Sequence, residues 1–182
     1  MVKVVITGGL GFLGRQICRH LLRQGTVFSP VSGAMAPISR VTLFDMENPE
    51  IVQQASSQQS AGVRAAGEDL TMLVDERVDI VGGNMTDAGT VAGLVDTDDI
   101  AVFHLASMMS GNSEDAFDDA WAVNVEGQRT LLEALRARAS APRFMFSSSV
   151  VRFAARHAAC HDGVEVCVCV CVRCVCVEGV VD

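Results

Sequence analysis

The sequence predicts an α/β fold built on a doubly wound parallel sheet. Short runs of β-branched apolar residues alternate along the chain with longer stretches in which apolar residues recur at helical spacing. The first of these runs leads directly into a glycine-rich turn. Strands that alternate with helices are joined by crossovers, which make neighbouring strands parallel and place helices on both faces of the sheet. We therefore expect a domain over residues 1–151 that binds its ligands at the carboxyl ends of the strands.

The composition is that of a globular protein and argues against a nucleic-acid-binding or membrane-spanning one. Hydrophobic residues make up 49% and charged residues 20% of the 182 residues, as in an ordinary globular domain. The formal net charge of -8 argues against a nucleic-acid partner, because nucleic-acid binders carry a basic face. No apolar run reaches the length of a membrane span, and the N-terminus lacks the pattern of a secretory leader. We expect a cytosolic protein with a small-molecule substrate.

In the first part of the chain, apolar runs predict strands at Val2–Ile6 and Val41–Phe44. The segment Gly25–Ser39 is rich in glycine, proline and serine and is expected to be a loop. Glu47–Val74 is polar and is expected to be an irregular insertion with some helix. A helix is expected at Phe12–Gln24, with one side formed by Leu13, Ile17, Leu21 and Leu22.

In the second part of the chain, strands are expected at Val78–Val81, Ile100–Leu105 and Arg143–Phe146. A short helix is expected at Asp87–Val95 and a long one at Glu114–Arg138. The long helix is expected to bury a single apolar stripe, formed by Phe117, Trp121, Val125, Leu132 and Leu135.

The stretch ITGGLGFLGRQI carries the strongest chemical signal. Gly9, Gly11 and Gly14 fit the pattern G-x-G-x-x-G. Gly8, Gly11 and Gly14 also fit the wider spacing G-x-x-G-x-x-G. Glycines let the chain turn tightly and let its backbone approach a pyrophosphate, while the following helix presents free N–H groups. The position between a strand and a helix is that of a Rossmann-type dinucleotide site, although an ordinary βα turn is the alternative. The predicted contacts to the cofactor come from Gly8, Gly11, Phe12, Leu13 and Gly14.

Asp45 closes the second predicted strand. A carboxylate at that place can accept both hydroxyls of an adenosine ribose and would repel a 2′-phosphate, which favours NAD over NADP as the cofactor. The spacing from the glycines exceeds the usual distance of about 20 residues because the loop before the strand is long. The alternative is an aspartate that simply ends a strand.

Taken together, these motifs resemble the extended short-chain dehydrogenases/reductases, the NAD-dependent epimerase/dehydratase family. Asp45 and the segments TGGLGFLG, GGNMTD, VFHLAS, NVEGQRTLLEAL and FMFSSS occur in that family's order. The stretch from Phe103 to Ala137 looks most like the family's D-erythronate dehydrogenase branch. The resemblance covers residues 1–151 and implies a Rossmann-type sheet that is incomplete at its C-terminal side.

The resemblance also implies roles for single residues. Asn84, where the family usually has aspartate, and Met85 would flank the adenine, and Asn124 would brace the backbone of the active site. The spacing alone leaves open whether Asn124 is a partly buried side chain that needs partners or a helix asparagine that faces a loop. Ser149 would hold the substrate hydroxyl. The cofactor's other contacts would come from Leu105, Ala106, Ser107 and Ser147.

By resemblance, the intact protein is an NAD-dependent dehydrogenase that oxidises a secondary hydroxyl of a small sugar acid such as D-erythronate. A nucleotide-sugar epimerase or dehydratase is the alternative within the family, and a non-catalytic nucleotide-binding module is the alternative from another class. Members of the family pair through helices, so the helix Glu114–Arg138 suggests a homodimer.

The chain departs from the family at the catalytic pair. Family members use a tyrosine to remove the hydroxyl proton and a lysine, four residues later, to lower the tyrosine pKa. This sequence contains no tyrosine, its single lysine is Lys3, and nothing after Val151 resembles the family. We therefore do not expect hydride transfer from the chain as it stands.

Residues 152–182 contain a tract in which valine and cysteine alternate between Cys167 and Val177. A metal site could draw on alternate cysteines and on His157, Cys160 and His161, but only Cys171 and Cys174 have zinc-like spacing. A half-buried strand would expose a row of thiols. TGT encodes cysteine and GTG encodes valine. A translated TG repeat therefore explains the tract better than a metal site or a half-buried strand does. We expect no metal site, and a tail that follows a frameshift, a misjudged gene boundary or a truncation.

Overall fold

The computed structural model of the protein describes residues 1–46, 75–108 and 116–147. The strands are β1 (Val2–Thr7), β2 (Thr26–Phe28), β3 (Met35–Asp45), β4 (Val78–Gly82), β5 (Ile100–His104) and β6 (Arg143–Phe146). The helices are α1 (Phe12–Gln24), α3 (Ala88–Leu94), α5 (Phe117–Trp121), the π-helical segment η2 (Ala122–Gly127) and α6 (Gln128–Arg136). None of the helices in these ranges has the length and apolar character needed to span a membrane. The predicted insertion Glu47–Val74 and the tail 152–182 lie outside the described residues.

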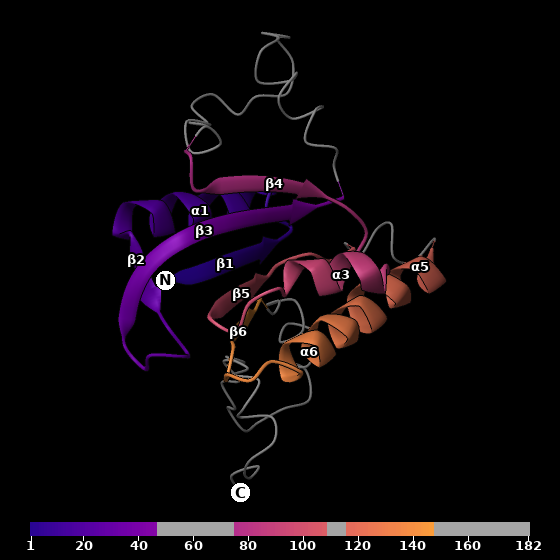
Figure 1. Ribbon diagram of the computed structural model, residues 1–182. Helices are drawn as coiled ribbons and strands as arrows, with labels where there is room; N and C mark the ends of the chain where they lie inside the picture. The colour runs from indigo at the N-terminus through magenta and orange to yellow at the C-terminus, as the bar shows by residue number, and fades with distance from the viewer. Residues whose placement is uncertain (47–74, 109–115, 148–182) are drawn as a thin grey trace, which may run out of the picture.

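Parallel pairing joins the strands in the spatial order β4-β3-β1-β5-β6. From β1 the chain winds outward through β3 to β4, then returns past β1 to β5 and continues to β6 (Figure 1). The direction of winding therefore reverses between β1 and β5, which confirms the doubly wound fold. In such sheets the crevice at the reversal is the usual place for a ligand.

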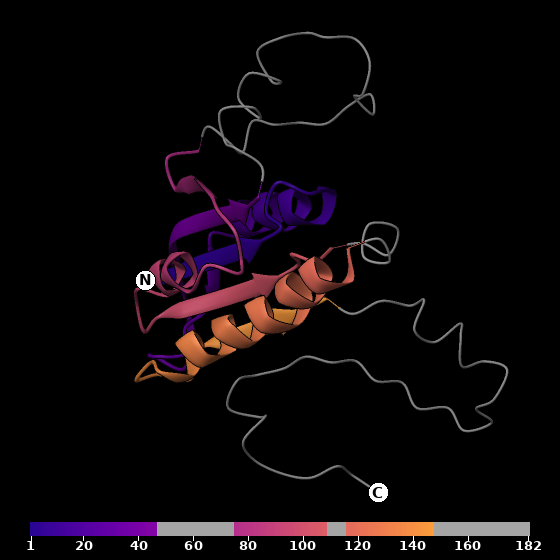
Figure 2. The ribbon, with the colours of Figure 1, turned by 90° about the vertical axis from the view of Figure 1, so that its right-hand side faces the viewer.

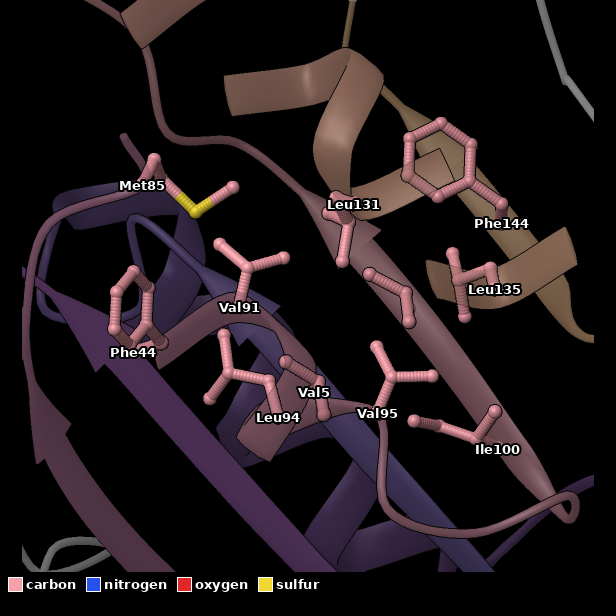
Figure 3. Close-up of a cluster of buried hydrophobic side chains, with 11 residues drawn as sticks. Val5, Phe44, Met85, Val91, Leu94, Val95, Ile100, Leu131, Leu135 and Phe144 are labelled. Carbon is pink, nitrogen blue, oxygen red and sulfur yellow. The ribbon is translucent and has the colours of Figure 1, made fainter. Parts of the chain in front are cut away.

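Helices cover both faces of the sheet, as predicted (Figure 1). On one face α1 packs Cys18 and Leu21 against strand residues such as Val4 and Val41. On the other face, α3 and α6 enclose a larger apolar cluster, shown in Figure 3. That cluster consists of Val5, Phe44, Met85, Val91, Leu94, Val95, Ile100, Val102, Leu131, Leu135 and Phe144. Leu13, which was predicted to lie on the packed side of α1, is instead 49% exposed.

The loop predicted at Gly25–Ser39 is wrong, because this segment contains an antiparallel hairpin of β2 with the start of β3. Gly25, with φ at 68°, ends α1 by donating its N–H to Leu21 O. The turn then closes through the N–H of Ser29, which donates to Ala34 O, and through Gly33 at φ 72°. Pairing between β2 and β3 gives these residues strand structure despite their turn-like composition, so the sheet is mixed.

The long predicted helix is present between Phe117 and Arg136 as the continuous series α5, η2 and α6 (Figure 2). Its predicted apolar stripe is wrong in the first half, where Phe117, Trp121 and Val125 are 66%, 51% and 40% exposed. The π-helical turn changes which side faces the sheet. The buried side is instead formed by Ala120, Val123, Gly127, Leu131 and Leu135.

Candidate dinucleotide-binding site

A cleft of about 270 Å³ opens at the carboxyl ends of β1, β3 and β5, at the reversal of winding. Most of the predicted cofactor contacts that the structure describes lie in it or support its wall. It is lined by Gly8, Gly11, Phe44, Asp45, Met46, Met85, Leu105, Ala106, Ser107, Met108 and Val123. Six of the predicted residues lie outside this lining, namely Phe12, Leu13, Gly14, Asn84, Asn124 and Ser147. Ser149 lies outside the described residues.

The glycine turn leaves no room for side chains at three positions, and the first of these is Gly9, where a Cβ would lie 2.8 Å from Leu43 Cα. Gly8 has φ 68°, and a Cβ built there would lie 2.9 Å from the backbone nitrogen of Ala106. A Cβ on Gly14 would lie 2.5 Å from Gly8 O, so this glycine lets α1 approach the turn closely. Gly11 lines the cleft, and a Cβ built on it would meet only Gly8 O, at 3.2 Å.

Helix α1 begins directly at this turn. Its N-cap is Gly11, and no side chain caps the first N–H groups. The first two residues of the helix, Phe12 and Leu13, are 68% and 49% exposed. Uncapped N–H groups at a helix N-terminus favour a bound anion such as a pyrophosphate.

The carboxylate of Asp45 connects the end of β3 to the glycine turn. Its Oδ2 accepts a hydrogen bond from the backbone N–H of Leu10 at 3.0 Å. Its Oδ1 accepts one from the N–H of Met46 at 2.8 Å. Each carboxylate oxygen has a second lone pair, so the group can accept a ligand hydroxyl while both bonds persist.

The wall of the cleft beside Gly8 is formed by the backbone that follows β5. The N–H of Leu105 donates to Thr7 O at 3.0 Å and lies 3.2 Å from Thr7 Oγ1. The N–H of Ala106 donates to the same hydroxyl oxygen at 3.3 Å. The hydroxyl oxygen of Thr7 lies 2.7 Å from Nδ1 of His104, whose pKa burial lowers to about 4. Thr7 and His104 were not among the predicted site residues.

Asn124 holds the next part of this wall. Its side-chain Oδ1 accepts the N–H of Met108 at 2.7 Å, and its Nδ2 donates to Met108 O at 3.2 Å. The residue is half-buried within η2, and π-helical turns often occur at functional sites. Both polar atoms of the Asn124 side chain are therefore hydrogen-bonded, and both bonds go to the backbone of Met108, in the segment after β5.

Asn84 and Met85 follow β4. The Oδ1 of Asn84 accepts the N–H of Thr86 at 3.0 Å, which forms a compact turn before α3. Met85 is 2% exposed, and a Cβ on Gly127 would lie 3.0 Å from its Cβ and its backbone oxygen. Gly127 thus lets η2 pack closely against this side of the cleft.

Ser147 follows β6 and donates its N–H to His104 O at 3.3 Å. Its backbone therefore lies beside the end of β5, although Ser147 does not line the cleft itself.

Another hollow, of about 430 Å³, lies between β2 and the β5–β6 edge. It is larger than the cleft, but its lining is mostly apolar and contains no part of the glycine turn. Its charged lining residue, Arg143, holds its guanidinium 4.2 Å from the ring centre of Phe28. We therefore regard the smaller cleft as the functional site. Within the described ranges, no three His, Cys, Asp or Glu side chains gather as a metal site would require.

The strand order, the glycine turn and the carboxylate at the end of β3 define a Rossmann-type dinucleotide-binding domain. The chain belongs to the NAD dependent epimerase/dehydratase family, which it matches over residues 4–165, beyond the boundary predicted at Val151. The cofactor of this family is NAD.

The chain is similar to two kinds of enzyme. The chain is 38% identical to a D-erythronate dehydrogenase of Cupriavidus necator over 149 residues, which are 82% of this chain and 39% of that protein. A nucleoside-diphosphate-sugar epimerase from Agrobacterium tumefaciens has a similar structure, with a TM-score of 0.58 and 25% identity over 82% of this chain and 37% of that one.

The UDP-glucose-4-epimerase of Stenotrophomonas maltophila, solved with bound NAD, shares the fold. Its TM-score is 0.55 at 21% identity, over 83% of this chain and 38% of that one. This chain spans about 39% of the length of the curated relatives that it matches.

Proposed function

We propose that residues 1–151 form the NAD-binding domain of a dehydrogenase and bind NAD in the cleft described above. The observation that carries the proposal is the bond from Leu10 N–H to Asp45 Oδ2, which holds a hydroxyl acceptor beside the glycine turn. The glycines suit a dinucleotide because Gly11 lines the cleft and, having no side chain, lets a pyrophosphate approach its backbone. A negative charge on Asp45 would repel the 2′-phosphate of NADP.

We assign the cofactor's parts from the geometry and from the family resemblance together. The pyrophosphate would lie on the backbone of Phe12 and Leu13, and the adenosine ribose on Asp45. Asn84 and Met85 would flank the adenine, while the wall Leu105–Ser107, with Ser147 near its end, would face the nicotinamide half. Bound NAD supplies a hydride acceptor, and Ser149 would hold the substrate hydroxyl.

We propose a small sugar acid of the D-erythronate type as the substrate of the intact protein. The 38% identity to a D-erythronate dehydrogenase supports this. A nucleotide sugar is the second candidate, favoured by the structural likeness to a nucleoside-diphosphate-sugar epimerase. The two differ in the fate of the hydride, because a dehydrogenase releases NADH and an epimerase returns the hydride to its substrate.

For the chain of 182 residues itself, we propose NAD binding without turnover. It has no tyrosine to remove a hydroxyl proton. Lys3 cannot serve as the family's lysine, because it lies on β1 and its ammonium pairs with Asp96 at 2.7 Å. The cytosolic location predicted from the sequence remains a prediction.

We also propose a homodimer through the first half of the long helix. Phe117 and Trp121 have ring centres 6.2 Å apart and form an exposed apolar patch with Val125. A Trp121→Glu variant should then be monomeric in light scattering. Met35→Glu, which changes a 60% exposed apolar residue on β3, is the matched control. A monomeric parent chain would remove this part of the proposal.

The central test is calorimetric titration of the full chain with NAD and with NADP. We expect NAD to bind at least tenfold more tightly, and Gly11→Val to abolish binding while leaving the circular dichroism spectrum unchanged. Gly93→Ala is the matched control, since a Cβ there meets nothing within 4 Å. Equal binding of both dinucleotides would remove the role of Asp45, and no binding of either would remove the proposed function.

A further inference from the structure

Thr7 and His104 form a buried polar pair directly beneath the wall of the cleft. They are register partners at the ends of the adjacent strands β1 and β5, and they are 0% and 1% exposed. Thr7 Oγ1 lies 2.7 Å from His104 Nδ1. Polar groups this deeply buried cost free energy unless each is hydrogen-bonded, so the direction of this bond matters.

The direction of the bond follows from the other partners of Thr7. A hydroxyl carries one hydrogen and two lone pairs. The N–H of Ala106 donates to Thr7 Oγ1 at 3.3 Å, and the N–H of Leu105 is shared between Thr7 O at 3.0 Å and Thr7 Oγ1 at 3.2 Å. These two donors face the lone pairs of the hydroxyl oxygen. The hydroxyl hydrogen is therefore donated to Nδ1 of His104. Nδ1 must then be unprotonated, which places the proton of the neutral imidazole on Nε2.

The imidazole is fixed on its other side by β6. Its ring centre lies 5.9 Å from that of Phe144 and 6.0 Å from that of Phe146, with interplanar angles of 28° and 26°. The backbone oxygen of His104 also accepts the N–H of Ser147. The ring consequently connects the ends of β1, β5 and β6, and burial keeps it neutral by lowering its pKa to about 4.

The Thr7 hydroxyl is bonded to a wall that lies against the glycine turn. Ala106, held by Thr7, lies so close to the glycine turn that a Cβ on Gly8 would come within 2.9 Å of the Ala106 nitrogen. If the Thr7 side chain rotated away from His104, the N–H of Ala106 would lose this acceptor, and the N–H of Leu105 would keep only its bond to Thr7 O. The wall Leu105–Ser107 would then be free to shift relative to Gly8.

We propose that His104 is a positioning residue for the dinucleotide site. As the Nε2–H tautomer it accepts the Thr7 hydroxyl and, through it, fixes the wall Leu105–Ser107 against the glycine turn. This inference rests on the proposed NAD binding and adds to it a residue that lies outside the cleft lining.

The first test reads the tautomer in the full chain labelled with ¹⁵N at histidine. Long-range ¹H–¹⁵N spectra between pH 5.5 and 8 should show one imidazole with an unprotonated Nδ1 and a protonated Nε2 that does not titrate. Loss of that signal in His104→Phe assigns it. A His104 with its proton on Nδ1, or one that titrates in this range, would overturn the inference.

The second test measures the dissociation constant of NAD for three variants. Thr7→Val keeps the volume of the side chain, and His104→Phe replaces the imidazole with a somewhat larger apolar ring. Both variants remove the bond, and each should weaken binding about tenfold, as expected for a lost buried partner. Thr7→Ser, which keeps the hydroxyl, should restore most of the affinity that Thr7→Val loses. Measurements are made well below each variant's melting temperature.

The outcomes separate the two proposals. A parent chain that binds NAD while His104→Phe binds it equally well overturns the role of His104 alone. A parent chain that does not bind NAD overturns the proposed function and this inference with it. Thr7→Ser as weak as Thr7→Val would show that the methyl group, and not the hydroxyl, matters at this position.

Discussion

Asp45 accepts the backbone N–H of Leu10 at 3.0 Å across 35 positions of sequence, and this bond joins the end of β3 to the glycine turn. The carboxylate therefore shapes the cleft besides offering an acceptor to a ligand. A substitution at this position has two separable consequences, one for folding and one for the choice of cofactor.

Two variants of Asp45 separate these consequences. Asp45→Ala leaves the N–H of Leu10 without its partner, so we expect the free energy of unfolding to fall by about 1 kcal/mol and NAD affinity to fall about tenfold. Asp45→Asn retains an acceptor oxygen and should be closer to the parent in stability, yet it should lose much of the preference for NAD over NADP. Urea titration and calorimetry measure the two effects. Unchanged NAD affinity in Asp45→Ala would remove the ribose assignment.

Two glycines that look alike in the sequence should respond oppositely to alanine. A Cβ on Gly14 would lie 2.5 Å from Gly8 O and 2.7 Å from Gly9 Cα, so Gly14→Ala should destabilise the protein by about 2 kcal/mol. Gly93 lies exposed in α3 with open space around it, and Gly93→Ala should stabilise by about 0.5–1 kcal/mol. The midpoint of urea unfolding reports both changes. Equal effects of the two substitutions would contradict the close approach at Gly14.

Local signals explain which parts of the fold the sequence predicts well. Helix α1 has the predicted bounds because a glycine turn precedes it and Gly25, in the left-handed region, ends it. The strand β6 also has its predicted bounds. The hairpin of β2 and β3 was missed because its residues resemble a loop and become strand only through pairing.

In the candidate site, too, local sequence patterns predicted some residues, whereas contacts between distant segments could not be predicted. Glycines and an aspartate at strand ends predicted the lining of the cleft at Gly8, Gly11 and Asp45. The pair Thr7 and His104 is separated by 97 positions, and no local pattern shows that the two side chains meet. The exposed side of α5 was missed because a π-helical turn changes the spacing that the apolar stripe assumed.

Cys18 should be inert toward alkylation in the folded protein. It is fully buried on α1, and burial, with Asp75 nearby, raises its pKa to about 11, so the reactive thiolate is scarce. After iodoacetamide treatment at pH 8, mass spectrometry should find the Cys18 peptide unmodified in the native chain and modified in guanidinium. Because the folded state favours the neutral thiol, Cys18 stabilises the fold below pH 9, and this stabilisation should be lost as the pH rises from 9 through 11. The stability of Cys18→Ala should not show this decrease. Rapid native labelling would contradict the packing of α1.

The buried imidazole of His104 predicts how stability depends on acid. Its pKa is about 4 in the folded protein and 6.5 in its ordinary state, so between these values the unfolded chain binds more protons than the folded one. Its contribution to stability should thus be complete above about pH 6.5 and decline as the pH falls toward 4. The full decline corresponds to about 3 kcal/mol. Among the described carboxyls with a lowered pKa, Asp75 falls from 3.8 to about 2, so its own loss occurs at lower pH.

The measurement is the free energy of unfolding by urea at pH 4.5, 5.5, 6.5 and 7.5 for the parent and for His104→Phe. The parent should become steadily less stable from pH 6.5 to 4.5, because each protonation of the imidazole favours the unfolded chain. His104→Phe should be less stable at pH 7.5 but should show a flatter dependence over the same interval. His20→Gln, which changes an exposed histidine, is the control variant. Parallel curves for the parent and His104→Phe would mean that the imidazole titrates freely, in which case the Thr7 hydroxyl is not held as the buried bond requires.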